Sequence, residues 1–298
     1  MREITFSQAL NEALREEMTR DERIFLMGED IGLHGGAFAV TKGLFNEFGP
    51  ERVRNSPLSE AGIAGIAVGA ALLGMRPVVE FMFVDFMTIA MDQIVNQAAK
   101  LRYMTGGQLL VSAVFRSQGG GVMPSTPYNA KGLLKSAIRD PNPVIFIEHK
   151  KLYSKKGEVP EGEYTLPIGK ARIARPGKDI TIIAYSRMVH LALEAAETLS
   201  KEGIESEVVD LQTLTPLDTE TIYASIRKTG RCITVEEDCK TGGFGAEVAA
   251  RVSEDCFDDL DAPVRRVASR DVPIPFAASL EFATIPQVED IIEKVRLR

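Results

Sequence analysis

The sequence has few of the residues, and none of the short motifs, that mark several common classes of protein. Its three cysteines show no C-x-x-C spacing and are odd in number, which favours free thiols over a disulfide framework. Its three histidines are scattered and cannot assemble a clustered metal site. No Walker A, H-E-x-x-H or G-x-S-x-G sequence occurs, so neither a phosphate-binding loop nor a hydrolase site is expected.

The charge and hydropathy of the chain exclude two further kinds of partner. The formal net charge is -7 and no basic stripe is present, so the chain would repel nucleic acid and anionic membranes. No apolar run is long enough to span a bilayer, and Met1 to Gln8 lack the apolar stretch of a signal peptide. We therefore expect a cytoplasmic protein with no nucleic-acid or membrane partner.

The length and the hydrophobic pattern predict two α/β domains. The 298 residues exceed what one hydrophobic core usually supports. Segments with helical periodicity alternate with short apolar runs, which is typical of a mostly parallel, doubly wound sheet. The periodicity fades over 150–178, where Lys, Gly, Pro and Glu crowd together, and then resumes. The sequence thus predicts one domain at 1–165 and a smaller one at 166–298.

The expected elements follow from the same periodicity. A helix is expected over 7–20 with Ser7 as its N-cap, followed by a strand over 24–27. Further helices of the first domain are expected at 59–73, 86–103 and 129–138, and strands at 77–83, 109–115 and 143–148. In the second domain strands are expected at 180–185, 205–210 and 231–236, and helices at 189–201, 218–228 and 245–256. The glycines at 242–245 lack the full dinucleotide-binding pattern and predict a turn into a helix.

The most informative helix begins at Ser59 and Glu60 and carries glycines at positions 62, 65 and 69. Each glycine costs a helix about 1 kcal/mol relative to alanine, which favours a tertiary reason for its presence. Small side chains let a flat ligand or a second backbone approach closely. Glu60 lies in the first turn, where the helix dipole favours an anion. In isolation, such a glutamate commonly does no more than stabilise its own helix.

A second window, 80–86, is an apolar strand that runs directly into a helix. Phe86 can stack on a planar ring, and Met82 can pack beside that ring. Core packing would explain either residue taken alone.

Four motifs in order resemble the β subunits of thiamine-diphosphate-dependent 2-oxo acid dehydrogenases. They are G-E-D-I-G at 28–32, P-L-S-E at 57–60, the segment 92–103 and D-V-P-I-P at 271–275. The resemblance runs nearly the full length, and the segments 125–134 and 156–160 bring it closest to the pyruvate and acetoin dehydrogenase branch. It implies a pyrimidine-binding domain followed by a transketolase C-terminal-like domain.

In that family thiamine diphosphate lies between two subunits. The α subunit holds the diphosphate and Mg²⁺ through a G-D-G…N motif, which this sequence lacks, and the β subunit holds the aminopyrimidine. The resemblance implies that Glu60 is catalytic, facing the pyrimidine ring nitrogen and moving its proton. It implies as cofactor-binding residues Glu29, Leu58, Ser59, Glu60, Met82 and Phe86. Some relatives have glutamine at position 82, and methionine does not replace the hydrogen bond of that side chain.

Many relatives also bind a structural potassium ion through backbone oxygens. The matching positions in this sequence are Ala113, Ala137, Ile138, Asp140 and Asn142. Backbone carbonyl oxygens suit a hard cation.

One segment departs from the family. Between Arg116 and Val122 the family has a longer segment with an H-S-Q-S motif, whose histidine assists the reaction, and only 117–121 stand here. A crossover between parallel strands needs about a dozen residues, which this connector does not supply. We expect that an active-site loop is missing from the sequence, which predicts a backbone gap wider than ~3.8 Å between Gly119 and Met123. A true deletion would predict little or no decarboxylation.

The leading hypothesis is the β subunit of a pyruvate or acetoin dehydrogenase that works as an α2β2 heterotetramer and passes an acyl group to a lipoyl acyltransferase. A split transketolase-like ketol transferase subunit shares the same pair of domains and stays open as an alternative. A non-catalytic assembly subunit is the second alternative. Replacement of Glu60 by Gln distinguishes an assembly subunit from an enzyme, because a docking protein would keep its full function in this variant.

Overall fold

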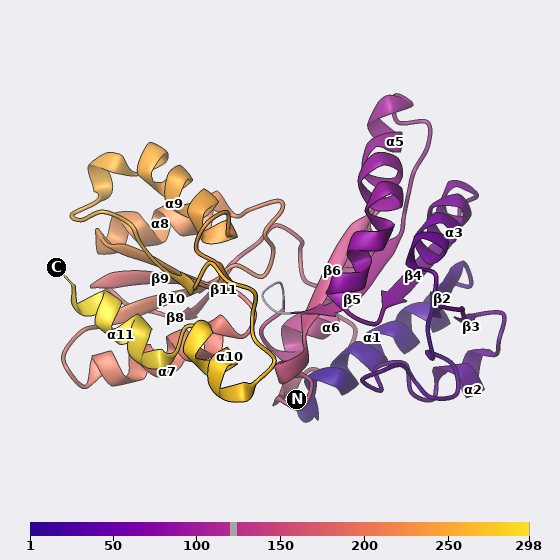
Figure 1. Cartoon of the computed structure of the whole chain (residues 1–298), viewed down its shortest axis with the longest axis horizontal. Coiled ribbons are helices and arrows are strands. Elements are labelled where there is room, and N and C mark those ends of the chain that lie inside the picture. Colours follow the sequence, from indigo (N-terminus) through magenta and orange to yellow (C-terminus); the bar gives the residue numbers. More distant parts are fainter. Residues whose placement is uncertain (120–123, 298) are drawn as a thin grey trace. The chain divides into compact units, whose positions relative to one another are not determined.

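The computed structural model describes residues 1–119 and 124–297, and the chain divides into two compact units (Figure 1). Unit 1 comprises Met1–Gly119 and Thr126–Ile168, and unit 2 comprises Gly169–Arg298 with the short segment that ends at Ser125. Each unit is an α/β structure built on a five-stranded sheet, which confirms the predicted fold class. No helix in the described part of the chain is long and apolar enough to cross a membrane.

The sheet of unit 1 has the order β3-β2-β4-β5-β6, and all neighbouring strands are parallel. Its strands are β2 (Ile24–Gly28), β3 (Val53–Asn55), β4 (Arg76–Phe81), β5 (Val114–Gly119) and β6 (Val144–His149). Its α-helices are α1 (Phe6–Arg20), α2 (Leu44–Phe48), α3 (Glu60–Leu72), α4 (Val84–Met87), α5 (Ala99–Met104) and α6 (Pro127–Arg139). A separate antiparallel ladder joins β1 (Arg2–Thr5) to β7 (Lys156–Val159).

Three predicted elements of unit 1 need correction. Thr5, not Ser7, caps α1, because the Thr5 side chain accepts the Gln8 N–H and the Gln8 side chain accepts the Thr5 N–H. The helix predicted over 86–103 is divided into α, 3-10 (Thr88–Ala90), π (Asp92–Ala98) and α segments. The strand predicted from 109 begins only at Val114, because the preceding Ala113 N–H is donated locally to Val111 O.

The crossover between β5 and β6 is longer than the sequence predicts. These strands are parallel neighbours, and α6 lies between them along the chain, so the connection from Gly119 to Val144 has the length that a parallel crossover needs. The expected shortage of connecting residues is therefore wrong. Residues 120–123, where a backbone gap is predicted, lie outside the described residues.

The sheet of unit 2 has the order β12-β11-β9-β10-β8, parallel except for β8, which is antiparallel to β10. Its strands are β8 (Arg172–Arg175), β9 (Ile180–Ala184), β10 (Ser206–Asp210), β11 (Cys232–Cys239) and β12 (Arg265–Ser269). Its α-helices are α7 (Met188–Ser200), α8 (Thr219–Thr229), α9 (Phe244–Asp255), α10 (Ala278–Thr284) and α11 (Val288–Arg296). Helices α7 and α11 bury one face of the sheet, and α8 and α9 bury the other. The turn predicted at 242–245 does open α9.

Buried charges join the two long helices α1 and α6, which lie side by side in unit 1 (Figure 1). The side chains of Lys131 and Lys135 are fully buried, and their amines lie 2.6 and 2.7 Å from the two carboxylate oxygens of Glu16. Lys135 also contacts Glu163 and lies 4.0 Å from the buried Glu17. A buried lysine is tolerated only when its charge is compensated in this way.

Replacing Lys135 by Ala should lower the free energy of unfolding by about 3 kcal/mol, because the substitution removes a fully buried side chain and its ion pairs with Glu16 and Glu163. Urea unfolding followed by circular dichroism measures the loss. The matched control is Arg15→Ala, which removes an exposed ion pair with Glu47 and should cost under about 1 kcal/mol. Equal losses in the two variants would contradict a structural role for the buried pair.

Candidate functional site

The residues predicted to bind a ligand gather at one edge of the unit 1 sheet. Gly28 at the end of β2 is in register with Glu80 of β4, so Glu29 and Met82 leave neighbouring strands at the same edge. The Ser56 N–H donates to Gly28 O at 3.0 Å, so the segment that leads into α3 also starts beside β2. The carboxyl edge of a parallel sheet is where open α/β folds bind ligands.

Two carboxylates at this edge are nearly buried and interact with each other. Glu29 and Glu60 each expose 8% of their surface. Burial is the main reason that the pKa of Glu29 is raised, and the negative charge of Glu60 raises this pKa further. Among the described residues, neither side chain has a hydrogen-bond or ion-pair partner. Buried acids without a partner are typical of a site that a ligand or a second subunit completes.

The start of α3 explains one of its three glycines. A Cβ at Gly62 would lie 2.7 Å from the Ser59 Oγ, so a larger residue here would displace the hydroxyl of the N-cap residue. The Ser59 side chain makes no capping hydrogen bond. A Cβ at Gly69 would meet nothing within 4 Å, and one at Gly65 would meet only Gln93 at 3.8 Å. These two glycines therefore leave open space on the surface of the helix.

The remaining predicted residues differ in exposure. Leu58 is 78% exposed and projects into solvent, whereas Met82 is half-buried at the end of β4. The ring of Phe86 is 38% exposed and packs edge-on against Phe83, with 5.8 Å between ring centroids. The structure thus brings Glu29 and Glu60 together and places an accessible aromatic ring just after the same edge.

The backbone oxygens assigned to potassium by resemblance lie near a guanidinium group. Arg76 Nη1 donates to Ile138 O at 2.8 Å and to Asp140 O at 3.3 Å. Ala113 O accepts the N–H that opens β6, and Ala137 O accepts the Asp140 N–H. A carbonyl oxygen carries two lone pairs, so the donor set still suits a hard cation, which would share two oxygens with Arg76. No side-chain cluster of metal-ligating type is found in the described part of the chain.

A buried ionic network at the same edge was not predicted from the sequence. Arg116 is 3% exposed and donates to both oxygens of Glu148, at 2.5 and 2.9 Å, and to Glu80 at 2.7 Å. The Tyr153 hydroxyl donates to Glu148 at 2.8 Å. Burial raises the pKa of Glu80 although Arg116 opposes that shift. The available signal was one charge of each sign within two predicted strands, and the structure places Glu80 of β4 opposite Arg116 of β5.

This network also determines the course of the loop that follows Glu29. Gly36 in that loop has φ +78°, and a Cβ there would lie 2.8 Å from Glu80 Oε1. Only glycine permits both the left-handed conformation and the close approach. The loop therefore packs directly on a carboxylate that Arg116 holds in place.

Comparison with known families assigns both units to one class of protein. The model described as "Transketolase, pyrimidine binding domain" matches residues 2–122, and "Transketolase, C-terminal domain" matches residues 169–291. The fold and the site define a transketolase-type protein with these two domains.

Full-length relatives are more specific. The pyruvate dehydrogenase E1 component subunit beta-2 of Oryza sativa subsp. japonica is 48% identical, covering 99% of this chain and 86% of the relative. The 2-oxoisovalerate dehydrogenase subunit beta of Bacillus subtilis is 47% identical, covering 93% of each chain. The chain belongs to the family of β subunits of 2-oxo acid dehydrogenase E1 components, which confirms the resemblance seen in the motifs.

Two further comparisons bear on the site. A solved structure of a split-gene transketolase, described as an inactive β4 tetramer, superposes with a TM-score of 0.81 at 26% identity, covering 98% of this chain and 97% of that one. The alignment with the rice protein spans 323 residues, more than the 298 of this chain, so the relative has residues that this sequence lacks.

Replacing Glu60 by Gln should lower the pKa of Glu29 toward its ordinary value, because the negative charge that opposes ionisation of Glu29 is removed. Carbon-13 NMR titration of labelled glutamate side chains measures the shift. The exposed Glu51→Gln variant serves as a control and should leave the Glu29 titration unchanged. An unaltered pKa in the Glu60 variant would show that the two carboxylates are not neighbours.

Proposed function

We propose that this chain is the β subunit of a thiamine-diphosphate-dependent 2-oxo acid dehydrogenase and that Glu60 activates the aminopyrimidine of the cofactor. The observation that carries the proposal is the pair of nearly buried, unpartnered carboxylates at the carboxyl edge of the unit 1 sheet. The bound cofactor supplies the electron sink for decarboxylation of the 2-oxo acid. A lipoyl acyltransferase accepts the acyl group. In this proposal 1–165 form the pyrimidine-binding domain and 166–298 the C-terminal domain.

The side chains at this edge fit a pyrimidine ring. Glu60 holds and moves a proton at the ring nitrogen, and its nearly complete burial keeps bulk water from exchanging that proton. Phe86 offers an accessible aromatic face for stacking, and Met82 and Leu58 supply apolar contact. Glu29 contributes a second carboxylate beside Glu60. Ser59 lies next to Glu60 as the N-cap residue of α3.

An α subunit completes the site in this proposal, holding the diphosphate and Mg²⁺ in an α2β2 assembly. The surface around α3 and the segments from α4 to α5 supports such a partner, because large hydrophobic side chains are exposed there. They are Leu58, Ile66, Leu73, Phe83, Phe86, Ile89, Val95, Tyr103 and Met104. Exposed apolar side chains gathered on one part of a surface mark interaction sites, and the open glycine positions on α3 would let another backbone approach closely.

The missing loop and the cytoplasmic location remain predictions. The longer alignment with the rice relative supports the proposal that an active-site loop is missing between Arg116 and Val122, where the family carries its H-S-Q-S motif. A cytoplasmic location is proposed from the sequence alone, and the relatives include mitochondrial and bacterial proteins.

Replacing Glu60 by Gln should reduce turnover of the reconstituted αβ enzyme by about 10²- to 10⁴-fold, the usual contribution of a positioned acid–base group. The measurement is thiamine-diphosphate-dependent acylation of a lipoyl domain with pyruvate, 2-oxoisovalerate or acetoin as substrate. The mass of the assembled complex should stay unchanged, which separates loss of chemistry from loss of assembly. Full activity in the Gln variant would exclude a catalytic role for Glu60 and favour an assembly subunit.

The structural similarity to a split-gene transketolase makes ketol transfer a second activity to test. The same reconstituted enzyme is assayed for ketol transfer between sugar phosphates. Ketol transfer without lipoyl acylation would replace the proposed function, whereas the reverse result supports it.

We also propose that the backbone oxygens of Ala113, Ala137, Ile138, Asp140 and Asn142 hold a potassium ion. Exchange of potassium for choline in the buffer should then lower the midpoint of thermal unfolding, because an ion that binds only the folded state stabilises it. The matched variant is Arg76→Met, which removes the guanidinium that shares two of these oxygens and should enlarge the potassium dependence. Identical midpoints with and without potassium in both proteins would contradict the site.

A further inference from the structure

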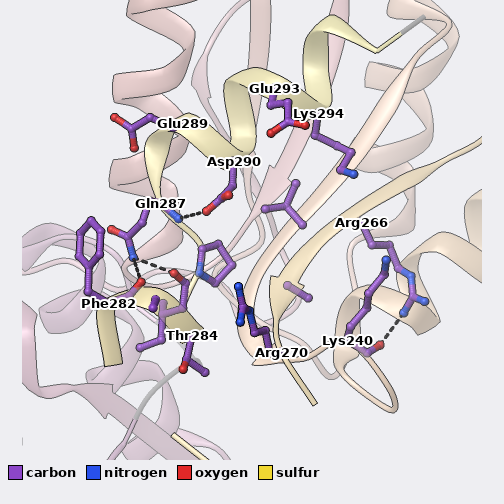
Figure 2. Close-up of a pocket in the computed structure, with 15 residues that line it drawn as sticks. Lys240, Arg266, Arg270, Phe282, Thr284, Gln287, Glu289, Asp290, Glu293 and Lys294 are labelled. Carbon is purple, nitrogen blue, oxygen red and sulfur yellow. Dashed lines mark hydrogen bonds between the residues drawn. The ribbon is translucent and has the colours of Figure 1, made fainter. Parts of the chain in front are cut away.

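Unit 2 contains a pocket of about 580 Å³ that the proposed function does not use (Figure 2). We call it the C-terminal pocket; β12, α10, α11 and the residues that connect them form most of its wall. Its volume lies in the range of small-molecule sites, roughly 300 to 1,000 Å³.

The C-terminal pocket lies along β12, the edge strand of the unit 2 sheet, and reaches the carboxyl ends of β12 and β11. Lys240 directly follows β11 and Arg270 directly follows β12, and these two strands are parallel neighbours. The Lys240 N–H donates to Ser269 O at 3.1 Å, which ties the two strand ends together. Part of the pocket wall thus lies at the carboxyl ends of strands, where open α/β sheets bind ligands.

Four cationic side chains converge on this pocket: Lys240, Arg266, Arg270 and Lys294. Arg266 Nη1 donates to the backbone oxygen of Lys240 at 2.8 Å. Within the described residues, none of the four forms an ion pair with a carboxylate. Their charges are therefore available to a ligand.

Two of these cations also act on an aspartate beside the pocket. The pKa of Asp271 is lowered mainly by hydrogen bonds from the N–H and hydroxyl of Thr241, and the charges of Lys240 and Arg266 lower it further. Asp290 also lines the pocket, but its Oδ2 accepts the Gln287 N–H at 2.7 Å and so caps α11.

The lining is divided by chemical type. Glu289 and Glu293 lie on α11, across the pocket from Arg266 and Lys240 (Figure 2). Phe282 of α10 lies at the end away from those two cations and is 64% exposed (Figure 2). An exposed aromatic ring offers a stacking surface for a planar group, while guanidinium and ammonium groups bind phosphate oxygens with charge-assisted hydrogen bonds.

We propose that the C-terminal pocket binds a nucleoside di- or triphosphate, with the base against Phe282 and the phosphates among Lys240, Arg266 and Arg270. The separation of one aromatic end from one cationic end matches the two ends of such a ligand. This pocket is formed by residues of unit 2 and uses neither member of the carboxylate pair in unit 1.

Isothermal titration of the full chain with ATP, pyrophosphate and adenosine tests the proposal. ATP should bind most tightly. Pyrophosphate and adenosine should each bind at least about tenfold more weakly, because each keeps only one of the two kinds of contact. Raising the salt concentration should weaken the binding of ATP and of pyrophosphate but not the binding of adenosine. Absence of ATP binding, or equal binding of ATP and pyrophosphate, would overturn the proposal.

Variants distinguish ATP binding in the pocket from non-specific electrostatic attraction to the protein surface. Arg270→Glu and Phe282→Ala change exposed side chains, and each should raise the dissociation constant for ATP by about tenfold. The matched control is Lys178→Glu, an exposed lysine of unit 2 that does not line the pocket, and it should leave the constant unchanged. Equal weakening by the control and by Arg270→Glu would mean non-specific attraction. Circular dichroism verifies folding, and Arg270→Gln provides a milder variant of the same position.

Discussion

The carboxyl edge of the unit 1 sheet depends on one buried cation, Arg116, which joins the ends of three neighbouring strands. Its guanidinium pairs with Glu80 on one side and Glu148 on the other. Removing such charges from water costs several kcal/mol per ion, and the geometry offsets this only when every donor and acceptor is satisfied. The Tyr153 hydroxyl contributes to this by donating to Glu148. The network therefore holds the strand ends in one arrangement rather than adding much net stability.

The position of Glu29 follows from that arrangement. Its loop passes over Glu80 through Gly36, which no other residue can replace without strain. Glu60 reaches the same edge by another route, from a helix whose N-cap Ser59 folds over Gly62. A left-handed glycine in one loop and a glycine in the first turn of a helix thus accompany the two acids, and Glu60 lies close enough to raise the pKa of Glu29.

Much of the fold and part of the candidate site were predictable from the sequence. The alternation of helical periodicity and apolar runs depends on local pattern, and it located β2, α3, β9 and α9 to within a few residues. The strand β8 and the pairing of β1 with β7 were missed, because antiparallel pairing between distant short segments leaves no local signature. The ion network around Arg116 was missed for the same reason, since its members become neighbours only when the sheet forms.

The carboxylates without a protein partner at the edge of the unit 1 sheet constrain what that edge can bind. In unit 1 the edge carries two carboxylates without a protein partner, so a diphosphate near them would meet repulsion rather than attraction. A ligand that has both a neutral ring and a diphosphate can use this edge only if another surface supplies the cations. The exposed apolar side chains around α3 are where such a surface would bind. The electrostatics of the site therefore support the proposed second subunit.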